Sequence, residues 1–180
     1  MAREISAGGV VLREISGMWH VALIEPQKSD SQKSEPRDET PNPDLKAAKA
    51  KTKMTRTRSH AVLGLPKGLV DPGEKPQAAA LREVVEETGI VAEPVAKLSD
   101  NKYVYVRSWG DGKRVFKIVS FYLMRYLSGE IDNLTSDMRI EVKRALWVPI
   151  ADAASQLAYS NERKVLRQAQ DYLEANGMPS

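Results

Sequence analysis

The sequence predicts an α/β fold in a single domain, and three observations support this prediction. Short apolar segments bounded by polar turns recur along the chain, which is typical of β-strands. Two other segments, residues 76–88 and 153–175, repeat their apolar residues at the period of a helix. The 180 residues, of which 42% are hydrophobic, are enough to bury one core. We therefore expect one domain over residues 1–180.

Composition narrows the classes of function. The chain contains no cysteine, which excludes a disulfide framework and a thiolate metal site. No apolar run approaches the length of a membrane span, and residues 1–10 lack the apolar core of a signal peptide. We therefore expect a soluble, cytoplasmic protein without membrane contact. Its formal net charge of +3 is too small to indicate a nucleic acid partner by itself.

The N-terminal part of the chain predicts a β-hairpin. Residues 5–12 and 18–25 are apolar, and Ser16 and Gly17 between them favour a turn. Gly8 and Gly9 lie inside the first strand, where glycine indicates a bulge or the close approach of another backbone or of a ligand.

Residues 27–59 have a different composition, rich in serine, proline and charged residues, and predict a flexible insertion. From Lys46 to Arg58 every charged residue is basic. Such an arm would make a weak contact with polyphosphate or RNA, whereas a solvated tether is the simpler interpretation. Because no aromatic residues are interleaved with these cations, the tether is favoured.

After the insertion, residues 60–65 predict a strand, and the helix predicted over residues 76–88 begins at Pro76 and ends before Gly89. On a helical projection, apolar residues and acids fall on opposite sides. The packing stripe consists of Leu81, Val84, Val85 and Thr88. The outward side consists of Glu83, Glu86 and Glu87. Carboxylates crowded at the negative end of a helix repel one another, so they indicate a site for Mg²⁺ or Mn²⁺, which prefer oxygen ligands. A solvated acidic face is the alternative.

The residues around this helix have the spacing of a known motif. Its fixed positions are Gly68, Glu74, Arg82, Glu83, Glu86, Glu87 and Gly89, with aliphatic residues at Val84 and Ile90. This pattern resembles the Nudix box of the MutT/Nudix hydrolase family at every defining position. The resemblance implies a Nudix fold, a mixed β-sheet sandwiched between helices (an α/β/α sandwich), and hydrolysis with a divalent metal.

The resemblance also implies roles for single residues. The carbonyl of Gly68 would join Glu83, Glu86 and Glu87 around the metal. Arg82 would orient the acids, and Glu74 would hold a metal-bound water or pair with that arginine. Either Glu86 or Glu87 would accept a proton from the attacking water. Glu141, just upstream of a segment that resembles the family's Trp-Val-Pro, is either a further metal ligand or base, or a surface glutamate.

Residues 90–98, 101–109 and 114–127 predict further strands, with a glycine-rich turn before the last one. Tyr103 and Tyr105 share one face at the period of a strand, where they either stack on a base or form part of an exposed sheet face. The last predicted helix, residues 153–175, packs through Leu157, Val165, Leu166, Ala169 and Leu173.

Three basic residues are candidates for phosphate contacts: Lys67, Arg114 and Lys117. Lys117 lies in a segment that resembles the branch of the family acting on diadenosine polyphosphates, and residues 157–159 with Arg163 resemble the same branch. Lys67 precedes Gly68 in Leu-Pro-Lys-Gly, which recurs in the family.

These features together predict a Nudix pyrophosphohydrolase whose substrate is a nucleotide polyphosphate. The leading hypothesis is a dinucleoside polyphosphate, with diadenosine tetraphosphate cleaved to ATP and AMP. The same motif also serves RNA 5′-pyrophosphohydrolases and enzymes acting on nucleoside triphosphates, nucleotide sugars or inositol polyphosphates. A third class, a non-catalytic nucleotide- or RNA-binding module, is disfavoured because the acid set is complete.

Overall fold

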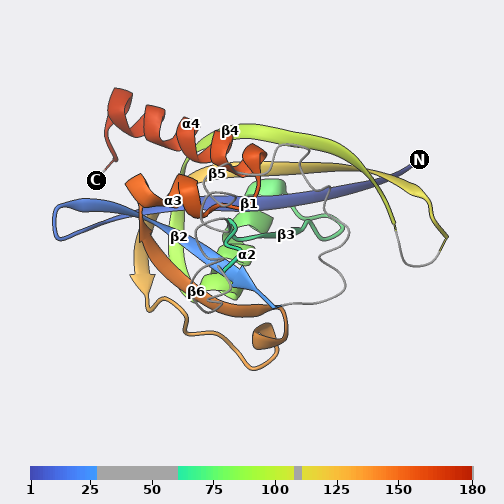
Figure 1. The fold of residues 1–180 in the computed structure, drawn as a ribbon, viewed down its shortest axis with the longest axis horizontal. Helices are drawn as coiled ribbons and strands as arrows, with labels where there is room; N and C mark the ends of the chain where they lie inside the picture. The colour runs from blue at the N-terminus through green and yellow to red at the C-terminus, as the bar shows by residue number, and fades with distance from the viewer. Residues whose placement is uncertain (28–60, 108–110, 180) are drawn as a thin grey trace, which may run out of the picture.

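A mixed β-sheet forms the centre of the molecule (Figure 1). The computed structural model describes residues 1–27, 61–107 and 111–179, so the predicted insertion lies almost entirely outside the described residues. The strands are β1 (Ala2–Ile15), β2 (Met18–Pro26), β3 (Lys67–Leu69), β4 (Ile90–Val106), β5 (Arg114–Gly129) and β6 (Val142–Pro149). Their order is β4-β5-β1-β2-β6, with β3 beside β1, and only the pairing of β1 with β5 is parallel among these pairs.

Helices cover both faces of this sheet, which confirms the predicted α/β/α sandwich. They are α2 (Pro76–Thr88), α3 (Ile150–Gln156) and α4 (Ser160–Asn176), with a short 3₁₀ helix, η3 (Met138–Ile140). On one face, α2 packs through Ala80 and Val84 against Val11 of β1. On the other face, α4 packs against β1 and β5 in a separate cluster that includes Val165, Leu166, Val10 and Phe121. No helix in the described ranges is both long and apolar enough to cross a bilayer.

Strand β1 is paired with two different strands along one of its edges. Near its end it forms the predicted hairpin with β2, where Ser16 and Gly17 take positive φ values of 51° and 78°. Nearer its start, residues 6–8 pair with β3. Between the two, the N–H of Gly9 donates to the carbonyl of Pro66 at 3.1 Å. The predicted close approach of another backbone is therefore confirmed.

The predicted strand at residues 60–65 is wrong for the part that the structure describes. Only isolated bridges are present there, from Gly64 to Ile24 and from Leu63 to Leu157. The N–H of Gly64 donates to Ile24 at 2.9 Å, but the N–H of Leu65 is bound by a side chain, Glu162, and Pro66 has no N–H. Because neither Leu65 nor Pro66 can donate an N–H to a neighbouring strand, continuous strand pairing cannot form here. The short strand β3 begins instead at Lys67.

The single helix predicted over residues 153–175 is two helices. Leu157 has extended backbone angles, is fully buried and bridges to Leu63, so it ends α3. The N–H of Ala158 donates to the carbonyl of Leu63 at 3.2 Å. The predicted packing residues Val165, Leu166 and Ala169 are nevertheless buried. A contact with a segment about ninety residues away therefore interrupts a helix that its own sequence favours.

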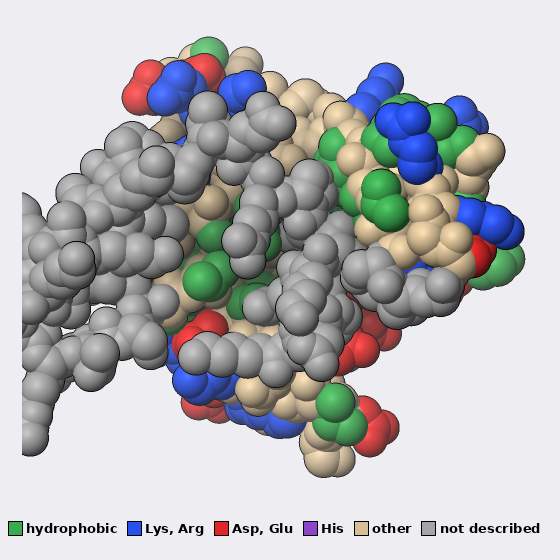
Figure 2. All heavy atoms as spheres, turned by 45° about the vertical axis from the view of Figure 1, so that its right-hand side comes forward, with side chains coloured by type: hydrophobic (Ala, Val, Ile, Leu, Met, Phe, Trp, Pro, Cys, Tyr) green, Lys and Arg blue, Asp and Glu red, His purple; other side chains and the backbone are tan. Residues whose placement is uncertain are grey.

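The strands predicted at residues 90–98 and 101–109 form one strand, β4, which pairs with β5 through three register shifts. The last of these shifts, between Lys97 and Asp100, absorbs the polar residues between the two apolar runs, and the other two lie within the first run. The hairpin of β4 and β5 extends beyond the part of the sheet that α2 covers, and Ile5, Val104 and Val106 are exposed there. Figure 2 shows hydrophobic side chains bordered by lysine and arginine on this side of the molecule.

The loop between β5 and β6 is held by Asp132, whose φ is 72°. Its Oδ1 accepts hydrogen bonds from Nη1 of Arg139 and from the N–H of Ala145, both at 2.8 Å. The hydrogen bond from Arg139 lowers the pKa of Asp132 below its ordinary value of 3.8. The ionised carboxylate therefore fixes the loop that carries Glu141.

We predict that Asp132→Asn lowers the free energy of unfolding at pH 7 by about 1–2 kcal/mol, because asparagine tolerates this backbone but removes the charge. A depressed pKa stabilises the folded state above the unfolded value of 3.8, and this stabilisation is lost as pH falls. Urea unfolding should show the difference between the two proteins shrinking below about pH 4. Asp137→Asn, in the same loop and exposed, is the control. An equal difference at every pH would contradict the charge-based explanation.

Candidate active site

Helix α2 has the bounds that its sequence predicts. Pro76 occupies the first turn, and Gly89, with φ of 79°, ends the helix by donating its N–H to the carbonyl of Val85. Lys75 provides no side-chain cap. Packing against the sheet therefore stabilises this helix, rather than an N-terminal cap.

The predicted faces of α2 are partly wrong. Glu83 and Glu87 are each only 8% exposed, whereas Val85, expected in the core, is 46% exposed. The buried side is formed by Ala79, Ala80, Glu83, Val84, Glu87 and Thr88. The two acids turn toward the segment that carries β3, which packs along this side of the helix, as the hydrogen bond from Lys67 to Glu87 shows. A helical projection cannot show which neighbour an acid faces.

Arg82 connects the acids of α2 with the preceding loop. Its Nε and Nη2 donate to the two oxygens of Glu74, both at 2.9 Å, which confirms the predicted pairing of these residues. Its Nη1 donates to Glu83 at 2.9 Å and to Glu86 at 3.2 Å. Nη2 also donates to the carbonyl of Leu69 at 2.9 Å. This arginine therefore sets the orientation of three carboxylates and closes the loop onto the helix.

The carboxylates around Arg82 differ in their affinity for protons. The hydrogen bond from Arg82 lowers the pKa of Glu74 to about 2. Burial instead raises the pKa of Glu83, and raises the pKa of Glu87 well above its ordinary value. The negative charge of Glu141 also contributes to raising both pKa values, so Glu141 is close enough to act on them. The charges of Glu86 and Glu141 thus act on Glu83, and the charges of Glu83 and Glu141 act on Glu87.

Gly68 lies against these acids. A Cβ atom at this position would be 2.1 Å from Cδ of Glu83, so only glycine allows the carboxylate to approach the backbone. The neighbouring N–H of Lys67 donates to Oε2 of Glu87 at 3.0 Å. The backbone of residues 67–68 and the acids of α2 therefore form one surface.

The chemistry of this donor set fits a divalent cation. All the possible metal ligands are oxygen atoms. Burial and mutual repulsion raise the pKa values of Glu83 and Glu87, so ionising them costs free energy, and a bound cation offsets this cost. In the described ranges, no three acidic or histidine side chains converge as a preformed metal site. Of the predicted ligands, Glu83 lies against Gly68, and Arg82 is bound to Glu83 and Glu86.

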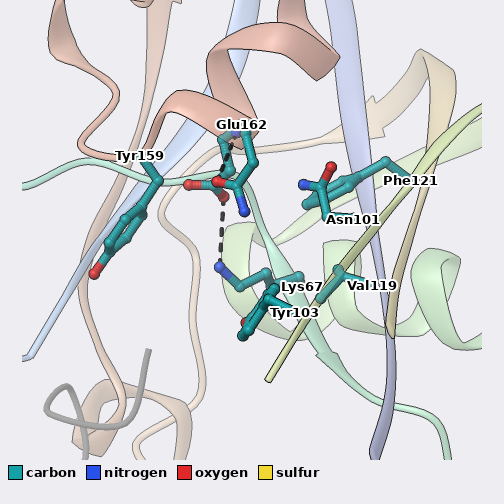
Figure 3. Close-up of a pocket in the computed structure, with 8 residues that line it drawn as sticks. Lys67, Asn101, Tyr103, Val119, Phe121, Tyr159 and Glu162 are labelled. Carbon is teal, nitrogen blue, oxygen red and sulfur yellow. Dashed lines mark hydrogen bonds and ion pairs between the residues drawn. The ribbon is translucent and has the colours of Figure 1, made fainter. Parts of the chain in front are cut away.

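A small, open pocket lies on the α4 side of the same segment (Figure 3). Its lining consists of Lys67, Asn101, Tyr103, Val119, Phe121, Tyr159, Asn161 and Glu162. Nζ of Lys67 is 3.5 Å from Oε1 of Glu162 and 5.8 Å from the ring centre of Tyr159. The pocket therefore has aromatic, amide and charged walls.

The predicted substrate-binding residues are placed differently from one another. Lys67 and Tyr103 line the pocket. Tyr105 is 8% exposed and donates its hydroxyl hydrogen to Oε2 of Glu4 at 2.9 Å, and Lys117 pairs with Oε1 of Glu4 at 3.2 Å.

Arg114 lies on the other face of β5. In the pairing of β5 with β4, Arg114 lies opposite Val106 and Lys117 lies opposite Tyr103. Arg114 and Lys117 are three residues apart, an odd number, so their side chains lie on opposite faces of the sheet. Arg114 is exposed on that face.

Sequence reasoning missed two acids, Glu4 and Glu162. A single acid in the first turn of a helix or near a strand end is ordinary, so neither had a local signal. The parallel register that places Glu4 opposite Lys117 joins positions far apart in the chain.

A family model described as the NUDIX domain matches residues 47–169. The chain belongs to the Nudix family. A candidate mutator protein, MutT4 of Mycobacterium tuberculosis, is 41% identical over 117 residues, 65% of this chain and 44% of that protein. The RNA pyrophosphohydrolase of Roseobacter denitrificans is 32% identical over 110 residues, 57% of this chain and 69% of that protein. The match spans less than half the length of MutT4.

Solved structures share the Nudix fold at low identity. A crystal structure of a C. elegans Ap4A hydrolase binary complex superposes with a TM-score of 0.61 at 22% identity, covering 96% of this chain and 98% of that one. The MutT NUDIX hydrolase of Burkholderia pseudomallei gives 0.58 at 19% identity, covering 93% and 98%. These likenesses show the fold. Family membership supports hydrolysis of pyrophosphate bonds over the predicted alternative of a non-catalytic binding module.

Proposed function

We propose that this Nudix protein is a pyrophosphohydrolase of dinucleoside polyphosphates, cleaving diadenosine tetraphosphate to ATP and AMP with Mg²⁺ or Mn²⁺. The observation that carries the proposal is the position of the acidic cluster beside the aromatic pocket. Lys67 belongs to both, because its N–H donates to Glu87 and its side chain lines the pocket. One segment thus connects a site suited to pyrophosphate with a site suited to a base.

The acidic side is proposed to carry the chemistry. Glu83, Glu86, Glu87 and the Gly68 carbonyl would hold the divalent ion, with Glu141 as a further ligand. A bound ion of this kind neutralises the pyrophosphate and lowers the pKa of a water molecule. Arg82 keeps Glu83 and Glu86 in fixed orientations through its hydrogen bonds.

The proton acceptor for the attacking water is proposed to be Glu86. Of the two candidates, Glu86 has a side chain that is 40% exposed, whereas Glu87 is buried, so Glu86 can exchange a proton with solvent after each turnover. The water oxygen bonds to phosphorus while the bond from that phosphorus to a bridging oxygen breaks. The bridging oxygen leaves with the departing polyphosphate, and Glu86 takes the proton.

The pocket side is proposed to hold one base. Tyr103 and Tyr159 offer aromatic faces, and stacking of a base on such a ring contributes about 1–3 kcal/mol. Asn101 and Asn161 offer amides that both donate and accept hydrogen bonds. Lys67 would contact the phosphate next to the cleaved bond, and Lys117, on the same face as Tyr103, a more distant one.

A second candidate is removal of pyrophosphate from triphosphorylated RNA. It is favoured by the relatives named RNA pyrophosphohydrolases, three of which are 44% identical to this chain over 72 residues. A relative from Mycolicibacterium smegmatis, 35% identical over 29% of its own length, is named an 8-oxo-(d)GTP phosphatase, which adds oxidised nucleoside triphosphates to the substrates to be tested. The proposed weak RNA contact of Lys46 to Arg58 lies outside the described residues.

A substrate panel tests the proposal. We expect kcat/KM to be highest for diadenosine tetraphosphate against ADP-ribose, nucleoside triphosphates, 8-oxo-dGTP and triphosphorylated RNA. In ¹⁸O-labelled water, each turnover should place the label in one product only. If another substrate is preferred by about tenfold or more, the substrate assignment is wrong and the Nudix chemistry remains.

The base pocket has its own test. Tyr103→Leu should raise KM for diadenosine tetraphosphate by about tenfold, because it removes a stacking surface. Tyr103→Phe keeps the ring and is the matched control, with KM near that of the wild type. KM is measured for both variants by steady-state kinetics. If Tyr103→Leu has the same KM as Tyr103→Phe, stacking on Tyr103 is excluded.

A further inference from the structure

Glu162 is a charged residue in the interior. It occupies the first turn of α4, its exposed fraction is 2%, and its carboxylate points into the pocket region between α4 and Lys67 (Figure 3). Burial of a carboxylate is costly unless it is paired and hydrogen-bonded. The N-terminal end of a helix favours a negative charge, which offsets part of that cost.

The partners of Glu162 lie in the segment that leads to Gly68. Its Oε1 accepts a hydrogen bond from the N–H of Leu65 at 3.0 Å and lies 3.5 Å from Nζ of Lys67. A Cβ at Gly64 would be 3.6 Å from Oε2, so the backbone passes directly beside the carboxylate. One side chain therefore binds Leu65 and Lys67 and lies beside Gly64, all within the four residues that precede Gly68.

Helix α2 holds the same segment from the opposite side of the sheet. Oε2 of Glu87 accepts the N–H of Lys67 at 3.0 Å, and Glu83 lies against Gly68. Leu65 and Lys67 are thus bound by two buried carboxylates, one from α4 and one from α2. The position of the Lys67 ammonium depends on both its backbone and its partner Glu162.

We propose that Glu162 is a positioning residue for the hydrolysis, acting through Lys67. It holds the ammonium at the border between the pocket and the acidic cluster, where a phosphate of the substrate meets it. This rests on the proposed contact of Lys67 with substrate. The purely structural alternative is that Glu162 only accepts the N–H of Leu65, for which a glutamine oxygen suffices.

A double-mutant cycle separates the two roles. The full chain is prepared as wild type, Lys67→Ala, Glu162→Gln and the double variant, and kcat/KM is measured with Mg²⁺ on the panel substrate that is turned over best. We expect Glu162→Gln to lower kcat/KM by about tenfold when Lys67 is present and by less than about twofold in the Lys67→Ala background. Glu174→Gln, on the exposed side of α4, should leave kcat/KM unchanged.

The thermal midpoint and the circular dichroism spectrum of each variant establish that it folds. If Glu162→Gln does not fold, the same cycle is run with Glu162→Asp, which keeps the charge but shortens its reach. Equal losses in both backgrounds would overturn the inference and leave the proposed function intact. Wild-type kcat/KM for Lys67→Ala would overturn the substrate contact of Lys67, and the inference with it. Because the best panel substrate is used, an error in the choice of diadenosine tetraphosphate does not affect this result.

Discussion

Replacing Glu87 by glutamine should reduce kcat by about 10²–10⁴-fold, because it removes a proposed ligand of the metal ion, while leaving the metal-free protein at least as stable as the wild type. Burial raises the pKa of this carboxyl well above its ordinary value, so keeping it ionised in the folded protein is costly near pH 7. Glutamine removes that cost, and its side-chain oxygen still accepts the N–H of Lys67. Loss of activity without loss of stability would distinguish a functional carboxylate from a structural one.

Calorimetry with and without Mg²⁺ measures how much the ion stabilises the wild type and Glu87→Gln. Mg²⁺ should raise the melting temperature of the wild type, because a ligand that binds only the folded state stabilises it, and the rise should be smaller for Glu87→Gln. Glu130→Gln, an exposed acid that is not among the proposed ligands, is the control for both measurements. Near-normal turnover of Glu87→Gln at saturating Mg²⁺ would show that Glu87 has no essential role.

Gly8→Ala should destabilise the protein by about 3 kcal/mol and impair activity at temperatures where it still folds. The added Cβ would lie 2.4 Å from the carbonyl oxygen of Pro66, 2.7 Å from Cβ of Lys67 and 2.9 Å from the ring of Phe121. Two of these three atoms are backbone or Cβ atoms, which cannot move without shifting the segment that leads to Gly68. Strain at β1 therefore reaches both the pocket and the acidic cluster.

Gly64→Ala is the matched control for this substitution. Its added Cβ would meet only the oxygens of Glu162, at 3.6 and 3.7 Å, which is ordinary contact. Urea unfolding of the two variants should therefore differ by about 2 kcal/mol or more. If Gly8→Ala is as stable as Gly64→Ala, β1 and the Pro66 segment are not packed as closely as the structure shows.

The parts of this molecule that local signals determine could be predicted from the sequence. Helix α2 begins at Pro76 and ends before Gly89 as expected, because both signals act on neighbouring residues. The partner of Arg82 at Glu86 follows from helical spacing alone. The approach of a second backbone to Gly8 and Gly9 was also predictable, since glycine in a strand interior indicates it, although not which backbone.

Features that depend on distant segments could not be predicted. Glu83 and Glu87 are buried because the β3 segment packs beside them, and a helical projection contains no information about that segment. The helix break at Leu157 depends on its bridge to Leu63. Lys117 was a candidate phosphate contact on the sequence, yet its partner Glu4 is set by the parallel register of β1 and β5.

The irregular outer strand β4 also bears on how this protein behaves at high concentration. An edge strand with a regular row of unpaired N–H and C=O groups is a template for pairing with another molecule. The three register shifts interrupt that row, Pro94 removes a donor, and the N–H of Ser99 is already bound by Gln168 of α4 at 3.1 Å. An incoming strand would find only short matching stretches, so this edge resists the sheet-to-sheet association that leads to aggregates.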